Sequence, residues 1–257
     1  MLHKFKIDTK FFEDKYFFDD IIFNFETKGT AYGNQDRNTL RLFNFNGDVI
    51  NVKSFRVPNL VNQIVYRFFR KSKAQRSYEY AKKLIQLGIG TPEPIAYYEF
   101  KSLFLFKKSY YISKQQNYDL TYRELTTDFN YPNYKEILRA FTCFTYKLHE
   151  KEIQFLDHSP GNTLIDLSEG EFKFYLVDLN RMKFGKMNFI ERMKNFAKLT
   201  IHKPMVEVMS NEYAKISGYK EEEVFSRMWE ATQKFQERFH RKRRLKKRLK
   251  FWKNYEN

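Results

Sequence analysis

The sequence predicts an α+β fold of two lobes, in which a β-rich first half carrying one main helix precedes a mostly helical second half. Two observations support this prediction. Short runs of β-forming residues alternate with turn signals between residues 12 and 113, whereas apolar residues recur at helical spacing from residue 134 onward. At 257 residues, of which 42% are hydrophobic, the chain is long enough to bury one sizeable core or two smaller ones.

In the first half, β-forming residues cluster or alternate in five segments, which we expect to be strands: Ile21–Phe25, Thr39–Phe43, Val49–Lys53, Ile95–Phe100 and Lys108–Ser113. Asn46-Gly47-Asp48 is a turn signal between two of them. One helix is expected over Lys71–Leu87, because Gly88 and then Pro92 follow it as a terminating glycine and a downstream proline would.

In the second half, Ile137, Phe141, Phe144 and Leu148 define one face of a helix over residues 134–151. A hairpin of Thr163–Asp166 with Glu171–Val177 is expected next, followed by three helical segments. The chain should cross between the halves near residues 114–119. The predicted organisation is therefore a β-rich lobe at residues 1–113, a helical lobe at 114–237 and a basic tail at 238–257.

Composition excludes several classes of protein. Cys143 is the only cysteine, so the chain can form no intrachain disulfide and no cysteine-based metal site, which fits a reduced, cytoplasmic setting. The first residues lack the extended apolar stretch of a secretory signal, and no apolar run is long enough to span a bilayer. We expect a protein that is soluble or peripheral to a membrane.

Three oxygen-bearing side chains have a spacing typical of phosphoryl transfer. Asp157 lies five positions before Asn162 in the loop Leu156-Asp157-His158-Ser159-Pro160-Gly161-Asn162, and Asp178 ends the apolar run Phe174-Tyr175-Leu176-Val177. Asp157 would accept a hydroxyl proton, while Asn162 and Asp178 would bind the Mg²⁺ that bridges nucleotide phosphates. Taken singly, Asp157 could cap a turn, Asn162 could be a turn residue and Asp178 could simply end a strand.

Lys53 is the predicted phosphate ligand, because it closes the strand Val49–Lys53 and can reach a nucleotide as a point charge. Glu79, the only acid between Arg70 and Gly88, is its predicted ion-pair partner. Each has a simpler alternative. Lys53 could be a solvated lysine on an edge strand, and Glu79 could pair with Lys83 four residues later on the helix surface.

Gly29 and Gly33 flank a turn whose backbone amides could cover the phosphates, although two glycines at this spacing commonly do no more than form a turn. His158 is expected to be structural or solvated rather than chemically active. Arg181 could meet an anionic acceptor, with a plain surface arginine as the simpler reading.

The charge of the chain is concentrated at one end. Of the formal net charge of +16, residues 238–253 contribute +10, because they hold ten Lys or Arg and no acid. Leu245, Leu249 and Trp252 would share one helical face among these cations, with Phe251 beside them. Such a helix can lie on an anionic membrane surface, which we rank above nucleic-acid binding and above a solvated end.

The order Lys53, Glu79, Asp157, Asn162 and Asp178 resembles that of the protein-kinase-like fold. Three segments are similar to the bacterial lipopolysaccharide kinases that phosphorylate Kdo or heptose of the inner core: Gly88-Ile89-Gly90-Thr91-Pro92-Glu93-Pro94, Phe155-Leu156-Asp157-His158-Ser159-Pro160-Gly161-Asn162 and Val177-Asp178-Leu179-Asn180-Arg181. The resemblance covers a little over half of the chain. Phe155 replaces the histidine of the catalytic triplet of protein kinases, Leu179-Asn180 replaces their Phe-Gly, and their long activation segment is absent.

This resemblance implies a kinase that uses ATP and Mg²⁺ at the cytoplasmic face of the inner membrane of a Gram-negative bacterium. Its acceptor would be a lipopolysaccharide core sugar or lipid A-Kdo, and no nucleic-acid partner is expected. Two alternatives remain at this stage: a small-molecule phosphotransferase of the aminoglycoside or choline kinase type, and a catalytically silent kinase-fold protein that binds a partner.

Overall fold

The computed structural model describes residues 2–33 and 38–255, and the chain divides into two compact units. The N-terminal unit comprises the residues up to Asn117 together with Tyr175–Arg181. The C-terminal unit comprises Tyr118–Phe174 and the residues from Met182 onward. The segment that contains Asp178 thus belongs to the N-terminal unit, although it lies far along the sequence.

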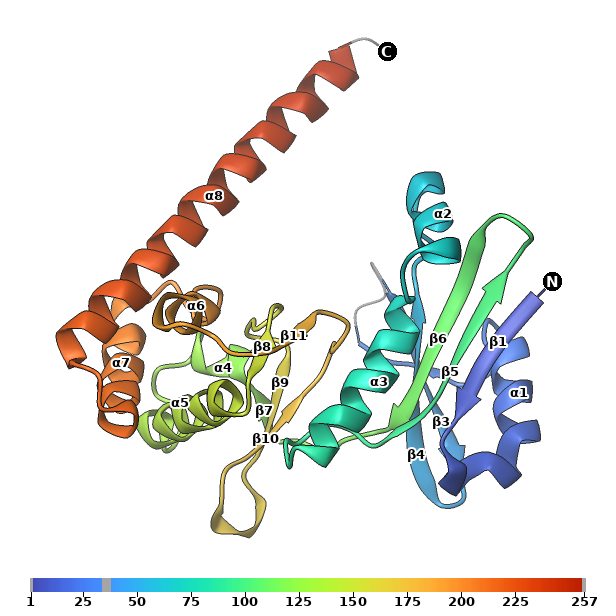
Figure 1. Cartoon of the computed structure of the whole chain (residues 1–257), viewed down its shortest axis with the longest axis horizontal. Helices are drawn as coiled ribbons and strands as arrows, with labels where there is room; N and C mark the ends of the chain where they lie inside the picture. Colours follow the sequence, from blue (N-terminus) through green and yellow to red (C-terminus); the bar gives the residue numbers. More distant parts are fainter. Residues whose placement is uncertain (1, 34–37, 256–257) are drawn as a thin grey trace. The chain divides into compact units, whose positions relative to one another are not determined.

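The N-terminal unit is built on a six-stranded antiparallel sheet with the order β1-β5-β6-β4-β3-β2 (Figure 1). The predicted turn at Asn46-Gly47 joins β3 to β4, and both of its residues have positive φ, at 50° and 85°. The strands are β1 (Leu2–Ile7), β2 (Thr30–Ala31), β3 (Asn38–Phe45), β4 (Asp48–Phe55), β5 (Pro94–Lys101) and β6 (Phe106–Lys114).

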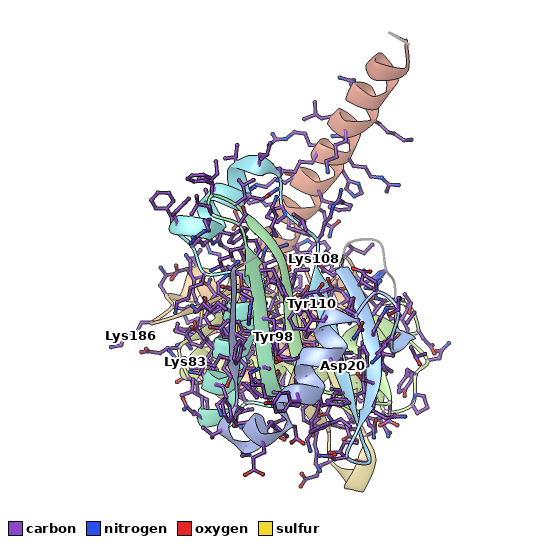
Figure 2. The ribbon with its side chains drawn as sticks, turned by 90° about the vertical axis from the view of Figure 1, so that its right-hand side faces the viewer. Asp20, Lys83, Tyr98, Lys108, Tyr110 and Lys186 are labelled. Atoms are coloured by element: carbon purple, nitrogen blue, oxygen red, sulfur yellow. The ribbon has the colours of Figure 1, made fainter. Side chains whose placement is uncertain are left out.

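Helix α1 (Lys15–Phe23), which follows the 3₁₀ turn η1 (Thr9–Asp14), covers one face of this sheet. The expectation of a strand at Ile21–Phe25 was therefore wrong. Phe18, Ile21, Ile22 and Phe25 are all buried at helical spacing, so one apolar face packs on the sheet. Burial of this face outweighed the local preference of Ile and Phe for strands. Figure 2 shows Tyr98 and Tyr110, which belong to the same core cluster.

Helix α3 (Lys73–Gln86) covers the other face, where Ala74 and Tyr78 pack with Phe55 and Tyr97. Ser72 caps its first turn by accepting a hydrogen bond from Gln75 N at 3.0 Å, and Gly88 follows its last turn with a φ of 66°. The predicted helix and its terminating glycine are thus confirmed. A shorter helix, α2 (Leu60–Phe68), precedes it and was not expected from the sequence.

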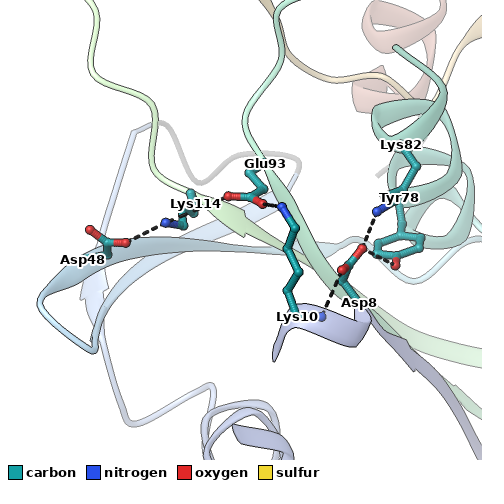
Figure 3. A network of polar contacts seen from close by, with 7 residues as sticks. All are labelled: Asp8, Lys10, Asp48, Tyr78, Lys82, Glu93 and Lys114. Atoms are coloured by element: carbon teal, nitrogen blue, oxygen red, sulfur yellow. Dashed lines mark hydrogen bonds and ion pairs between the residues drawn. The ribbon is translucent and has the colours of Figure 1, made fainter. Parts of the chain in front are cut away.

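Polar contacts join the N-terminal segment to α3 and the sheet (Figure 3). The Asp8 carboxylate accepts hydrogen bonds from Lys10 N, Lys82 Nζ and Tyr78 Oη. Lys10 Nζ in turn binds Glu93 at 3.0 Å. These contacts fix the start of η1 beside the helix that carries Glu79.

The C-terminal unit is mostly helical, with a core formed by one face of α5, by α6, α7 and the start of α8. Its helices are α4 (Tyr122–Leu125), α5 (Tyr134–Glu150), α6 (Phe189–Asn195), α7 (Lys203–Ser217) and α8 (Glu221–Tyr255). The predicted face of α5 is confirmed at Ile137, Phe141 and Leu148, each fully buried. Helix α8 continues through residue 238 without a break, so the predicted basic tail is its last part (Figure 1).

Short strands position the loops of this unit: β7 (Leu120–Thr121), β8 (Ile153–Phe155), β9 (Thr163–Asp166), β11 (Met182–Phe184) and the first half of β10 (Lys173–Leu176), whose second half belongs to the N-terminal unit. They form a three-stranded sheet in the order β10-β9-β7 and an antiparallel pair of β8 with β11. The turn η2 (Ser168–Gly170) lies between β9 and β10, as expected for the predicted hairpin. The loop from β8 to β9 carries Asp157 and Asn162.

Among the residues that the structure describes, no helix is both long and apolar enough to cross a membrane.

Candidate active site

Lys53 and Asp178 form the centre of a polar site in the N-terminal unit. Lys53 Nζ lies 2.8 Å from Asp178 Oδ1, although 125 positions separate the two residues in the sequence. Lys53 comes from β4 on the face that α3 covers, and its ammonium lies 5.5 Å from the ring centre of Phe55. The side chains are 17% and 29% exposed, so the ion pair is shielded from bulk water without being sealed from it.

Asp178 adopts a left-handed backbone conformation, with a φ of 58°. Non-glycine residues rarely adopt this conformation, and such residues cluster at functional sites. The strand before Asp178 is held by two hydrogen bonds to the segment after α3: Leu176 N donates to Gly90 O at 2.9 Å, and Thr91 Oγ1 donates to Leu176 O at 2.8 Å. Gly90 and Thr91 thus support the position of the Asp178 carboxylate.

The charges around Asp178 keep it ionised. Burial alone would raise the pKa of this carboxyl, but the charge and hydrogen bond of Lys53, a hydrogen bond from Asn180 and the charge of Lys73 together lower it. Asn180 Nδ2 donates to Asp178 Oδ1 at 2.8 Å. Because Lys53 and Asn180 both bind Oδ1, the second carboxylate oxygen is the atom that a cation could use.

Lys73, the first residue of α3, adds positive charge to this site. Burial lowers the pKa of its ammonium; Asp178 opposes that effect, whereas the charges of Arg181 and Lys53 lower the pKa further. Lys73 therefore lies within electrostatic reach of two other cations, Lys53 and Arg181, and of the Asp178 carboxylate. Such an excess of positive charge favours a polyanion such as a triphosphate.

The predicted ion pair between Lys53 and Glu79 is not present, and this expectation was wrong. Glu79 instead accepts hydrogen bonds from Lys71 Nζ at 2.8 Å and from Gln75 Nε2 at 2.9 Å. Burial would raise the pKa of Glu79, but the bonds from Lys71 and Gln75 lower it. Lys53 forms its ion pair with Asp178 instead. Glu79 is bound by Gln75 on its own helix and by Lys71, which lies just before that helix.

Asp157 and Asn162 lie on one loop of the C-terminal unit and are linked to each other. Asn162 Nδ2 donates to the backbone carbonyl of Asp157 at 2.8 Å, which leaves Asn162 Oδ1 as a possible cation ligand. Lys198, in the segment after α6, donates from Nζ to Leu156 O at 2.6 Å and lies 3.4 Å from Asp157 Oδ1. The carboxylate of Asp157 is 27% exposed, so it is accessible to an acceptor hydroxyl.

Two buried histidines support this loop from inside the unit. His149 binds Tyr213 Oη at 2.9 Å and Asn195 Oδ1 at 3.2 Å, while Asn195 Nδ2 donates to Phe155 O at 2.8 Å. His158 packs between the rings of Phe141 and Phe155, and neither of its ring nitrogens has a hydrogen-bond partner. Burial lowers the pKa of His149 to about 4 and that of His158 to about 3, so both are neutral at pH 7.

Gly29 and Gly33 lie on either side of strand β2. A Cβ atom on Gly29 would come within 2.6 Å of the Phe43 ring and 2.9 Å of Leu42 O, and the φ of Gly29 is 77°. Gly29 is thus required by the packing of the turn against β3. Gly33 has a φ of 66° and open space where a Cβ would be. Their predicted role in covering phosphates stays a prediction.

Each unit has a side-chain oxygen of the kind that Mg²⁺ binds, rather than the nitrogen and sulfur ligands of a transition-metal site. Within residues 2–33 and 38–255, no group of three or more His, Cys, Asp or Glu side chains could hold a metal ion. Mg²⁺ needs no such cage, since one or two carboxylates, substrate phosphates and water commonly complete its octahedral shell. In the N-terminal unit Asp178 offers a carboxylate oxygen, and in the C-terminal unit Asn162 separately offers an amide oxygen.

No family model matches the sequence, and no curated protein matches it. The fold, in contrast, is widely shared, since 1065 chains of solved structures are similar to it. One of them is the structure of WaaP in complex with acyl carrier protein, with a TM-score of 0.63 and 15% sequence identity; the alignment covers 93% of this chain and 98% of that one. The predicted two-lobed α+β fold, with an antiparallel sheet in the first lobe and a mostly helical second lobe, is thus confirmed, and it is the fold of that structure.

Several residues of the site were not expected from the sequence. Asn180 and Thr91 support Asp178, and they lie inside the segments that carry the family resemblance, which was the one available signal. Nothing in the sequence distinguishes Lys73 from the other lysines of a basic chain. Lys198 lies 41 positions after Asp157, and no motif connects the two.

Proposed function

We propose that this chain is an ATP-dependent kinase that phosphorylates a sugar hydroxyl, of Kdo or heptose, in the lipopolysaccharide inner core. The observation that carries the proposal is the contact between Lys53 and Asp178, where a strand lysine meets an ionised carboxylate in a left-handed conformation. Phosphoryl transfer depends on positioning and on neutralisation of charge, and both are served by such a lysine and a metal-binding carboxylate. The resemblance of the Asp157 and Asp178 segments to lipopolysaccharide kinases supports the same class of reaction, and the chain shares the fold of WaaP.

Each site residue has a distinct role in this proposal. Lys53 binds the phosphates of ATP, and Lys73 adds positive charge. Glu79 does not position Lys53; it orders the start of α3 through Lys71 and Gln75. Asp178 and Asn162 hold Mg²⁺, which neutralises the charge on the phosphates when bound. Asp157 accepts the proton of the acceptor hydroxyl, and Lys198 keeps its carboxylate in place. Gly29 and Gly33 shape the turn that covers the nucleotide.

The acceptor of such a kinase is attached to a membrane, and the charge of α8 supports a peripheral location at the cytoplasmic face of the inner membrane. The described side chains of residues 238–248 are all exposed, and Phe239 and Leu245 are each 51% exposed among the cations. The side chains of Leu249, Phe251 and Trp252, which complete the predicted apolar face, lie outside the described residues. We propose that this part of α8 contacts anionic headgroups.

The test is transfer of phosphate from ATP to purified core acceptors that carry Kdo or heptose, followed by mass spectrometry of the product. The intact chain should add one phosphate in a reaction that requires Mg²⁺. Asp157→Asn should lower kcat by roughly 10²–10⁴-fold, the usual contribution of a positioned base, while ATP binding measured by calorimetry is retained. Normal turnover by Asp157→Asn would remove the proposed base.

A small-molecule acceptor, as in aminoglycoside or choline phosphotransferases, keeps the same chemistry. An acceptor panel with and without lipopolysaccharide fragments separates the two functions. A catalytically silent protein would show no Mg²⁺-dependent consumption of ATP with any acceptor. Because WaaP is in complex with acyl carrier protein, the panel should also include binding to that carrier, as an alternative partner for the cations of α8.

A further inference from the structure

An unusual apolar surface lies on the N-terminal unit, formed by α2 and the turn between β5 and β6. We call it the α2 surface. Its large side chains are at least 45% exposed, and Phe69 is 83% exposed; they are Leu60, Val61, Ile64, Phe68, Phe69, Leu103 and Phe104. Helix and turn are joined, because Arg67 Nε donates to Ser102 O at 3.2 Å and the rings of Tyr66 and Phe106 lie 5.7 Å apart. Figure 1 shows α2 beside the start of β6.

The amphipathic character of α2 is inverted. In a helix that packs on its own protein, apolar side chains face the core and polar ones face water. In α2 no residue is buried; Gln63 Nε2 donates to Pro58 O at 2.9 Å, Arg67 binds the β5–β6 turn, and the Tyr66 ring packs on Phe106. The large side chains of Leu60, Val61, Ile64 and Phe68 are instead exposed. Packing within the unit therefore does not explain why the helix is apolar.

The charge of the surrounding sequence is one-sided. Residues 49–78 and 100–118, which contain α2 and the β5–β6 turn, include eleven cations and no acid. Five of these cations pair with carboxylates of other segments: Lys53, Lys71, Lys101, Lys108 and Lys114. Arg67 and Arg70 lie over the rings of Phe68 and Tyr66, at 5.1 and 5.7 Å, and neither has a carboxylate partner among the described residues. The α2 surface thus has an apolar centre with a cationic border.

This combination selects one kind of partner. Two copies of the chain meeting through this surface would bring their cationic borders together, which is unfavourable. An anionic bilayer offers an apolar interior and negatively charged headgroups to the same surface. We propose that the α2 surface docks on an anionic lipid bilayer, with Val61, Phe68 and Phe69 entering the boundary between headgroups and acyl chains and Arg67 and Arg70 binding lipid phosphates.

This docking is independent of the proposed function, since it needs neither ATP nor a core sugar. It is also separate from the proposed contact of residues 238–253, because those residues belong to the C-terminal unit. The N-terminal unit would bind lipid through a surface of its own.

The experiment is sedimentation of the full-length protein with vesicles of phosphatidylcholine alone and of phosphatidylcholine mixed equally with phosphatidylglycerol. The double variant Val61→Asp with Phe69→Asp should bind the anionic vesicles about tenfold more weakly or worse, since it removes two apolar contacts and adds two negative charges. Tyr16→Asp is the matched control, because Tyr16 is an aromatic residue of the same unit that is 86% exposed and lies on α1. It should bind as the unaltered protein does.

A depth measurement separates the α2 surface from α8. In a Cys143→Ser background, a nitroxide attached at Val61→Cys should become protected from a water-soluble relaxing agent on anionic vesicles, whereas one at Tyr16→Cys should not. Equal vesicle binding by the double variant and by Tyr16→Asp, or no protection at position 61, would overturn the proposal. The proposal would also be overturned if the protein self-associated without lipid and the double variant abolished that association. The α2 surface would then be a contact between copies of the chain.

Discussion

At the scale of single residues, the site depends on side chains that the backbone places in unusual positions. Asp178 occupies a left-handed conformation that costs about 1–2 kcal/mol for a non-glycine residue. The bonds of Lys53 and Asn180 to Oδ1 and of Thr91 to the preceding carbonyl offset that cost. One of the four described non-glycine residues with positive φ is thus the carboxylate proposed to bind the metal, as expected if its strain is retained for function.

Substitution of Lys53 tests this arrangement. We expect Lys53→Met to lower kcat/KM for ATP by roughly 10²–10³-fold, the cost of removing one charge-stabilising group from a transition state. Lys53→Arg keeps the charge but not the compact ammonium, so it should recover only part of the loss. Steady-state kinetics measures both, with circular dichroism to check the fold. Unchanged kcat/KM in Lys53→Met would contradict the assigned role.

The two buried histidines give a prediction about pH. Their folded pKa values, about 4 and about 3, lie below the ordinary value of 6.5, so the unfolded chain binds more protons than the folded one below that pH. Stability should be complete above pH 6.5 and fall as the pH drops towards 4, by about 1.4 kcal/mol per pH unit for each histidine. Denaturant titrations between pH 7 and pH 4 measure this slope.

The two histidines also provide matched variants. His158→Leu should flatten the pH slope without loss of stability at pH 7, because the ring nitrogens of His158 have no hydrogen-bond partner to lose. His149→Leu should flatten the slope too, but cost about 1–3 kcal/mol at pH 7, since Tyr213 and Asn195 lose their partner. A slope that neither variant changes would show that other groups control acid stability.

At the scale of elements, the turn before β3 depends on one glycine. Gly29→Ala should lower the free energy of unfolding by about 2–4 kcal/mol, because the new Cβ meets the Phe43 ring and Leu42 O and the left-handed backbone adds its own cost. Gly33→Ala adds only the cost of the left-handed backbone, so it should lower the free energy of unfolding by only about 1 kcal/mol. Thermal denaturation compares them. Equal losses would show that the close approach at Gly29 is relaxed in solution.

Helices and strands with clear hydrophobic spacing or turn signals were predictable from the sequence. Elements whose structure depends on tertiary contacts were not. The helices α3 and α5 follow from their caps and apolar spacing, as does the β3–β4 hairpin from Asn46-Gly47. Helix α1 was mistaken for a strand at Ile21–Phe25 because a short apolar run fits either structure until its packing is known. Helix α2 was not expected from the sequence, and most of its large apolar side chains are exposed rather than buried in the unit.

The same limit applies to the site. The residues of the Asp157 loop and Asp178 could be chosen from their chemistry and spacing, since both lie in continuous motifs. The partner of Lys53 could not, because the choice between Glu79 and Asp178 depends on how β4, α3 and the segment after β10 meet. Lys73 and Lys198 carry no local signal that separates them from the other lysines of a basic chain.

At the scale of the whole molecule, the last part of α8 should matter for membrane binding but not for folding. The core contacts of this helix are made by Val224, Met228 and Thr232, all before the basic segment. Deletion of residues 238–257 should therefore leave the thermal midpoint and phosphate transfer to a soluble acceptor unchanged, while it weakens binding to anionic vesicles, most strongly at low salt. Stronger loss of RNA binding than of vesicle binding would favour a nucleic-acid partner instead.

We propose that this chain adds a phosphate to the lipopolysaccharide core through the residues around Asp157 and Asp178. Mass spectrometry of lipopolysaccharide tests it most directly, in cells that carry the intact gene, no gene, or the gene with Asp157→Asn. We predict that one core phosphate is present with the intact gene and missing in the other two strains. Lipopolysaccharide of identical phosphate content in all three would contradict the claim.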